Sequence, residues 1–151
     1  MKQHRGFSLI ELMIVIVIVG VLASIAIPGY KDYVIRSRVP EAISALSDAR
    51  VRLEQFFQDN RTYPTGGCVI SPTAPSTTQI ALPAGSSFGL GCGTPTATAY
   101  TVTATGSGNM AGFTYTINQS NTRTSTFSGS GASAGWTNST TCWITKKGGA
   151  C

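Results

Sequence analysis

The sequence predicts an α+β fold in which a long N-terminal helix, membrane-spanning in its first half, packs on a small antiparallel β-meander. Three observations support this prediction. An almost entirely apolar run lies near the N-terminus, an amphipathic stripe follows it, and threonine-rich segments of alternating polarity occupy the second half of the 151-residue chain. A chain of this length suits one domain of ordinary size with a modest core.

The apolar run covers residues 7–27, and Glu11 carries its only charge. As a helix with a rise of about 1.5 Å per residue, it reaches about 30 Å and can cross a bilayer. Lys2 and Arg5 precede it, so the positive-inside rule predicts a cytoplasmic N-terminus with the rest of the chain outside. A carboxylate inside such a segment is unfavourable by about 2.5–3.5 kcal/mol at the bilayer centre, which marks Glu11 as a functional residue with a partner.

A junction at Gly6-Phe7 joins a basic leader, residues 1–6, to the apolar run. Cleavage there would free an amino group on Phe7. Residues i and i+4 share one side of a helix, so Glu11 faces the same side as that amino group. We therefore expect an ammonium at Phe7 to be the partner of Glu11.

The second half of the helix begins after Pro28-Gly29. Proline removes one i to i−4 hydrogen bond, so a kink or an unwound stretch is expected at this pair, and Pro40 is a second candidate for a bend. An apolar stripe then recurs at alternating spacings of four and three residues, at Ala42, Leu46, Ala49, Leu53 and Phe56. The helix should end near Asn60 as a rod of about 80 Å, with its first half standing free of the head.

The remaining residues, 62–151, should form the head. Period-two alternation predicts half-buried strands at 100–104 and 113–117, joined by a turn-rich connection, with apolar residues facing the helix. A third strand is expected at 123–127 and a short fourth one at 142–144. Irregular loops are expected at 64–95, which is rich in proline, and at 128–135, which is rich in glycine and serine.

The charge distribution argues against an enzyme. All six carboxylate side chains lie before residue 62, and the single histidine is His4, so residues 62–151 have no Asp, Glu or His to act as general base or metal ligand. A Ser-His-Asp triad, a carboxylate pair or a histidine-containing zinc site is therefore excluded from the head. We expect a structural or binding protein with no cofactor and no metal.

Four cysteines lie beyond the membrane segment, on the side of the membrane that is outside the cytoplasm, and disulfides persist in that compartment. They are Cys68, Cys92, Cys142 and Cys151. Four cysteines allow three connectivities, and the sequence alone does not choose among them. Cys68–Cys92 and Cys142–Cys151 are favoured because each pair closes a local loop that lacks the apolar content to hold itself. A zinc site is the alternative, although zinc ligands usually come in closely spaced pairs.

The segment Gly6-Phe7-Ser8-Leu9-Ile10-Glu11, with its basic leader, the aliphatic run, Pro28 and Tyr30, strongly resembles the class III signal and first helix of type IVa pilins. The resemblance implies that prepilin peptidase cleaves after Gly6, that Phe7 is N-methylated, and that Glu11 neutralises the amino terminus of a neighbouring subunit. It divides the chain into a leader (1–6), a transmembrane and assembly helix (7–29), the second half of the helix (30–61) and the head (62–151).

The resemblance also implies a function and partners. The expected protein is a structural subunit of a type IV pilus that supports adhesion, twitching motility or DNA uptake. Its partners would be other pilin subunits in a helical filament, prepilin peptidase, the inner-membrane assembly platform and the membrane. The precursor would sit in the bacterial inner membrane, and the mature subunit in the extracellular pilus. Type II secretion pseudopilins share the same signal and are the alternative, although they generally lack a terminal disulfide loop.

The loop between Cys142 and Cys151 is like the disulfide-bounded D-region of type IVa pilins, and with the threonine-rich strands it makes the chain most like the minor pilins of the PilE/ComP group. Members of that group serve as DNA receptors, which draws attention to Trp143, Lys146 and Lys147 in this loop. Lysines attract phosphates and aromatic rings stack on bases. The alternative is that the lysine pair is a solvated edge and that Trp143 belongs to the core.

Overall fold

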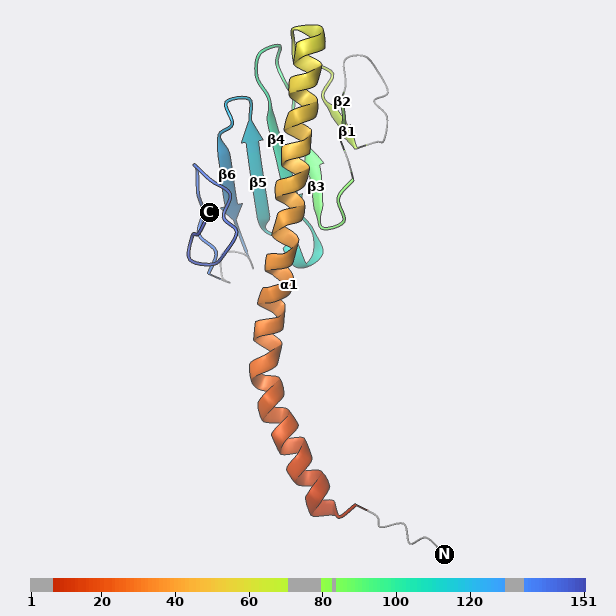
Figure 1. Cartoon of the computed structure of the whole chain (residues 1–151), viewed down its shortest axis with the longest axis vertical. Helices are drawn as coiled ribbons and strands as arrows, with labels where there is room; N and C mark the ends of the chain where they lie inside the picture. The colour runs from red at the N-terminus through yellow and green to blue at the C-terminus, as the bar shows by residue number, and fades with distance from the viewer. Residues whose placement is uncertain (1–6, 71–79, 83, 130–134) are drawn as a thin grey trace, which may run out of the picture. The chain divides into compact units, whose positions relative to one another are not determined.

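The computed structural model describes residues 7–70, 80–82, 84–129 and 135–151 (Figure 1). The leader with Gly6, part of the proline-rich loop and the middle of the 128–135 loop lie outside the described residues. The elements in chain order are α1 (Leu9–Asn60), β1 (Cys68–Ile70), β2 (Ile80–Leu82), β3 (Phe88–Gly91), β4 (Thr101–Gly106), the 3-10 helix η1 (Gly108–Met110), β5 (Phe113–Asn118) and β6 (Arg123–Phe127). The chain divides into two compact units, Met1–Val34 and Ile35–Cys151, and α1 contributes to both.

The first unit is the apolar part of α1. The helix begins where the carbonyl of Ser8 accepts hydrogen bonds from the N–H groups of Glu11 and Leu12, at 3.1 and 3.2 Å. Its large apolar side chains are exposed, from 49% for Met13 to 82% for Phe7. This helix is long and apolar enough to span a membrane, and none of its most apolar window is buried within the chain.

The α-helix continues without interruption through Pro28-Gly29 and through Pro40, so no unwound stretch is present at either proline. Each proline removes a single i to i−4 hydrogen bond, and the bonds of the turns on both sides are enough to continue the helix. The prediction of an unwound segment is therefore wrong. A kink at Pro28-Gly29 stays a prediction.

The second unit contains a four-stranded antiparallel sheet in the order β3-β4-β5-β6, and the second half of α1 lies across one face of it (Figure 1). Side chains alternate along the strands, so that Phe113, Tyr115 and Ile117 of β5 are buried. The predicted stripe of α1 faces them: Ala42, Leu46, Ala49 and Leu53 are fully buried, and Phe56 is partly buried. The predicted fold class is confirmed, and the core lies between one helix face and one sheet face.

One predicted strand is absent and another was missed. Residues 142–144 form no strand. Trp143 and Ile144 are both buried although they are adjacent, whereas neighbouring residues of a strand point to opposite faces. The fourth strand is instead β3, which lies inside the segment 64–95 that was expected to be irregular. Phe88 and Leu90 are its buried positions, and the glycines that alternate with them resemble turn residues in the sequence.

The same segment contains a small parallel pair, β1 with β2, in which Cys68 lies opposite Ile80. A disulfide joins Cys68 to Cys92, with their Cα atoms 5.7 Å apart. It links β1 to the residue that follows β3, and it is one of the two favoured pairings. Regular structure therefore extends further into this segment than its proline content indicates.

Two carboxylates of α1 hold the surrounding chain. Glu54 accepts hydrogen bonds from the hydroxyls of Tyr63, at 3.3 Å, and Tyr100, at 3.1 Å, which ties the end of the helix to the residue before β4. Burial and the hydrogen bond to Glu54 raise the pKa of Tyr100, so its hydroxyl stays a donor at neutral pH.

Glu41 holds the turn that leads into β3. Its Oε1 accepts hydrogen bonds from the backbone N–H of Ser86, at 2.7 Å, and of Ser87, at 2.8 Å. Gly85 is required in this turn because a Cβ there would collide with the carbonyl of Phe88. Desolvation by itself raises the pKa of Glu41, but the hydrogen bonds from Ser87 and Ser86 outweigh it and hold the pKa below its usual value.

We predict that Glu41→Ala destabilises the second unit by about 1–2 kcal/mol at pH 7, because two backbone donors lose a charged acceptor. The pKa of Glu41 is lowered in the folded state, so its contribution is present above its ordinary pKa of 4.5 and is lost as pH falls through the folded value. Urea unfolding of the wild type and the variant at pH 7 and pH 3 tests this.

The control is Asp48→Ala, which breaks an exposed ion pair with Arg52 at 2.9 Å and should change stability by less than about 1 kcal/mol. A Glu41→Ala effect of equal size at both pH values would contradict the role given to its charge.

Candidate functional site

The sequence-predicted site residues fall in two regions. In the first unit, Phe7 lies two residues before α1 and Glu11 lies in its first turn, whereas Trp143, Lys146 and Lys147 lie in the C-terminal loop of the second unit. Each region is built differently. The first is an exposed apolar helix with one charge, and the second is a short loop closed by a disulfide.

Glu11 lies in the first turn of α1, and both it and Phe7 are exposed. A carboxylate is favoured at this end of a helix because the free N–H groups carry partial positive charge. Among the described residues, no cation lies within 4.0 Å of the Glu11 carboxylate.

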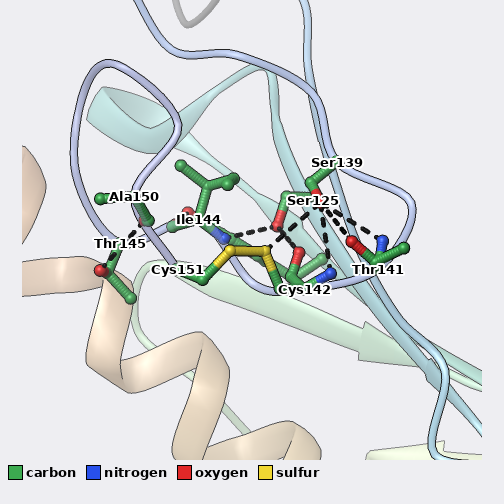
Figure 2. The surroundings of a disulfide bond; sticks show 9 residues. Ser125, Ser139, Thr141, Cys142, Ile144, Thr145, Ala150 and Cys151 are labelled. Carbon is green, nitrogen blue, oxygen red and sulfur yellow. Dashed lines mark hydrogen bonds between the residues drawn. A yellow bond between two sulfur atoms is a disulfide. The ribbon is translucent and has the colours of Figure 1, made fainter.

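The C-terminal loop comprises residues 143–150 and is closed by a disulfide between Cys142 and Cys151, whose Cα atoms are 5.9 Å apart (Figure 2). This is the second favoured pairing. The N–H of Thr145 donates to the carbonyl of Ala150 at 2.9 Å. Gly148 and Gly149 adopt positive φ angles of 82° and 84°, which favour glycine, and they make the tight reversal at the tip.

Ser125 of β6 fixes the base of this loop (Figure 2). It is 1% exposed, its hydroxyl donates to the carbonyl of Cys142 at 3.0 Å, and the N–H of Ile144 donates to the same hydroxyl at 2.9 Å. Its backbone also exchanges two hydrogen bonds with Ser139, at 2.8 and 2.9 Å. The hydroxyl of Tyr115 reaches the carbonyl of Ile144 at 3.1 Å. The base of the loop is therefore held by hydrogen bonds as well as by the disulfide.

Trp143 is a core residue and does not offer its ring to a base. It is 7% exposed, and its indole N–H donates to the carbonyl of Thr116 at 2.8 Å. The guanidinium carbon of Arg123 lies 4.8 Å from the ring centroid and covers one face. Lys146 and Lys147 are exposed, so the loop presents two cations without the aromatic platform that the sequence suggested.

Two functional features escaped the sequence analysis. Ser125 is one of many serines, and nothing in the sequence distinguishes it. Arg123 is the one charged residue in 62–145, which could have identified it. Together with Arg50, it lines a cleft of about 400 Å³ between α1 and the adjoining ends of β5 and β6. All four cysteines are in disulfides, so the alternative of a zinc site is wrong.

Two family models match the chain. One, described as type IV minor pilin ComP, DNA uptake sequence receptor, matches residues 28–116. The other, described as a prokaryotic N-terminal methylation motif, matches residues 1–27. Together they cover both the second half of α1 with much of the sheet and the apolar segment with its leader.

Curated relatives are fimbrial proteins. A fimbrial protein of Pseudomonas aeruginosa is 40% identical over 79 residues, which is 52% of this chain and 47% of that protein. The type IV major fimbrial protein FimA of Dichelobacter nodosus is 42% identical over 74 residues, or 49% and 42% of the two chains. The matched region thus spans less than half the length of these relatives.

Among solved structures, the non-core minor pilin PilV of Neisseria meningitidis superposes with a TM-score of 0.50 and 13% sequence identity, over 64% of this chain and 91% of that one. At this identity the likeness is one of fold. It agrees with a helix packed on a four-stranded antiparallel sheet.

We predict that the paired change Cys142→Ser and Cys151→Ser lowers the unfolding free energy by about 2–3 kcal/mol, the entropy of closing a short loop. Hydrogen exchange should accelerate at the amide of Thr145, whereas the amides of Ile144 and Ser139 should stay protected, because their acceptors belong to Ser125.

Ser125→Ala is the matched comparison. It removes the acceptor of the Ile144 amide and should expose that amide to exchange while the disulfide stays intact, at a cost of about 1–3 kcal/mol for unpaired buried groups. If loss of the disulfide alone freed Ile144 and Ser139, the independent role of Ser125 would be refuted.

Proposed function

We propose, since this chain belongs to the type IV minor pilin ComP family and carries the prokaryotic N-terminal methylation motif, that it is a minor structural subunit of a type IV pilus. The observation that carries the proposal is the exposed apolar helix with a single carboxylate, attached to a separately compact head. An apolar surface of this kind is stable in a membrane or among other apolar helices. Pilins are structural proteins, and no reaction is assigned to this chain.

We propose that the subunit is first processed in the inner membrane and then assembled into the filament. The precursor sits in the inner membrane through residues 7–29 with its N-terminus in the cytoplasm, where prepilin peptidase removes residues 1–6 and Phe7 is methylated. The assembly platform then moves the subunit into an extracellular filament, which supports adhesion, twitching motility or DNA uptake. Inside the filament, Glu11 pairs with the ammonium at Phe7 of a neighbouring subunit, which compensates the charge in apolar surroundings.

A type II secretion pseudopilin is the competing assignment, because its N-terminal signal is the same. The closed loop between Cys142 and Cys151 favours the pilus, since pseudopilins generally lack it. The relatives described as fimbrial proteins point in the same direction.

A second candidate function, reception of DNA at the pilus surface, draws on the description of the matching family. The exposed pair Lys146 and Lys147 supports contacts with phosphates. Because Trp143 is buried, this loop would contact the DNA backbone without stacking on bases. Such contacts attract DNA and do not read its sequence.

Glu11→Ala should leave cleavage intact and reduce the amount of subunit in sheared filaments by more than about tenfold, because an unpaired buried ammonium costs about 3–5 kcal/mol. Immunoblots of sheared filaments and of the cell fraction measure assembly and processing separately. The matched control in the same helix is Ser24→Ala, whose hydroxyl only bonds the carbonyl of Val21 at 2.7 Å.

Substitution of Gly6 should block cleavage as well as assembly, leaving an uncleaved precursor in the membrane and none in filaments. Normal incorporation of the Glu11→Ala subunit into filaments would contradict the proposal that assembly requires the pairing of Glu11 with the ammonium of Phe7.

If the loop receives DNA, Lys146→Ala with Lys147→Ala should weaken duplex binding by residues 35–151 and reduce the slope of log affinity against log salt by about 1.8, the value for two lost phosphate contacts. Arg61→Ala, an exposed cation at the end of α1, is the control. Unchanged affinity and slope in the double variant would leave the lysine pair as a solvated edge.

A further inference from the structure

The cleft beside α1, which we call the arginine cleft, holds a net positive charge, because Arg50 and Arg123 line it with a single acid, Glu54. Arg50 Nη1 donates to Asn121 Oδ1 at 2.9 Å, and Arg123 Nε donates to the same oxygen at 3.4 Å. Two guanidinium groups thus converge on one neutral acceptor. Among the described residues, no carboxylate lies within 4.0 Å of either group.

Glu54 offsets one of the two positive charges, and its oxygens are already bonded within the chain. Glu54 accepts hydrogen bonds from the hydroxyls of Tyr63 and Tyr100. The rest of the lining is mixed, with the exposed apolar side chain of Val51 beside the amides of Gln55 and Gln58. A cleft of about 400 Å³ with this lining suits a side chain of another protein that ends in a carboxylate.

The second unit, Ile35–Cys151, carries one such side-chain carboxylate that is not already bonded. Residues 62–151 contain no Asp or Glu. Glu41 is bound by Ser86 and Ser87, and Asp48 is bound by Arg52. The side chain of Asp59, by contrast, is exposed and makes no hydrogen bond or ion pair within the described part of the chain.

Asp59 also lies where a helix disfavours an acid. It is in the last turn of α1, where the free carbonyl groups carry partial negative charge, and this turn contains no basic residue. A cation brought to Asp59 from another molecule would relieve this repulsion. Both the arginine cleft and Asp59 are therefore electrostatically incomplete in the single chain.

Helix geometry prevents the two from meeting within one molecule. Asp59 follows Arg50 by nine residues, which places it about 14 Å further along the helix axis and about 180° around it. A second copy shifted along that axis can place its Asp59 against the cleft of the first. Because the two surfaces differ, the contact is heterologous and joins two neighbouring copies head to tail.

We propose that the arginine cleft of one subunit binds Asp59 of a second copy of this chain in the filament. The proposal rests on the proposed function as a pilus subunit and adds the identity of a neighbour and the residues of the contact. Arg50 and Arg123 bind the carboxylate, and Asn121 holds the two guanidinium groups together.

The test places a photoreactive benzoylphenylalanine at Val51 of the full chain, expressed in its own bacterium beside a tagged copy. Val51 lines the cleft and is 55% exposed, so its replacement should not disturb folding. After irradiation of intact filaments, mass spectrometry should identify a crosslink to the peptide of a second copy that contains Asp59. A crosslink to a different pilin, to another segment, or to nothing in filaments that contain the subunit would overturn the proposal.

Charge variants at the other side of the contact sharpen the result. Asp59→Asn and Asp59→Lys should lower the crosslink yield at least about threefold, whereas Asp59→Glu should retain it. Asp48→Asn, which removes an acid already paired on the same helix, is the matched control and should leave the yield unchanged. Equal yields with Asp59→Lys and with the wild type would overturn the ion pair.

The two proposals fail in distinguishable ways. Absence of the wild-type subunit from filaments would refute the function as a pilus subunit, and the contact with it. Presence in filaments with crosslinks elsewhere would refute only the contact.

Discussion

The packing of one narrow helix stripe against the sheet is the contact on which the rest of the head depends. Ala42 and Ala49 are fully buried, and their small side chains let the backbone of α1 approach the strands closely. Leu46 and Leu53 fill the space between them against Tyr115 and its neighbours in the core. Since a helix and a sheet each bury one face, this single layer contact provides the core of the unit.

The charged side chains of the helix and of the sheet side have different roles around this contact. The carboxylates that flank the stripe, Glu41 and Glu54, receive hydrogen bonds from the turn before β3 and from two tyrosines, and so hold loops to the helix. The sheet side contributes only cations, among them Arg123 on Trp143. All the acids of the head therefore lie on its helix, where they are interspersed with arginines.

The fold could be predicted from the sequence wherever an element is buried on one face only, because its apolar residues then recur at a regular spacing. The alternation in β4, β5 and β6 and the stripe of α1 are direct consequences of half-buried surfaces, so the sequence displays them. β3 was missed because its exposed positions are glycines, which carry no polar signal. The site was harder to predict, since the burial of Trp143 and the hydrogen bonds of Ser125 depend on contacts between distant segments. No local pattern records such contacts.

In the C-terminal loop, the residues that attach it to the head differ from the residues that it exposes to solvent. At its base, the Ser125 hydroxyl bonds the carbonyl of Cys142 and the N–H of Ile144. The disulfide between Cys142 and Cys151 fixes its other end. Residues 145–147 lie between these two attachments and contribute nothing to the core. Only the reversal at Gly148-Gly149 restricts the residue type. Substitutions at residues 145–147 can therefore change the charge and polarity of the loop surface without changing the fold that carries it.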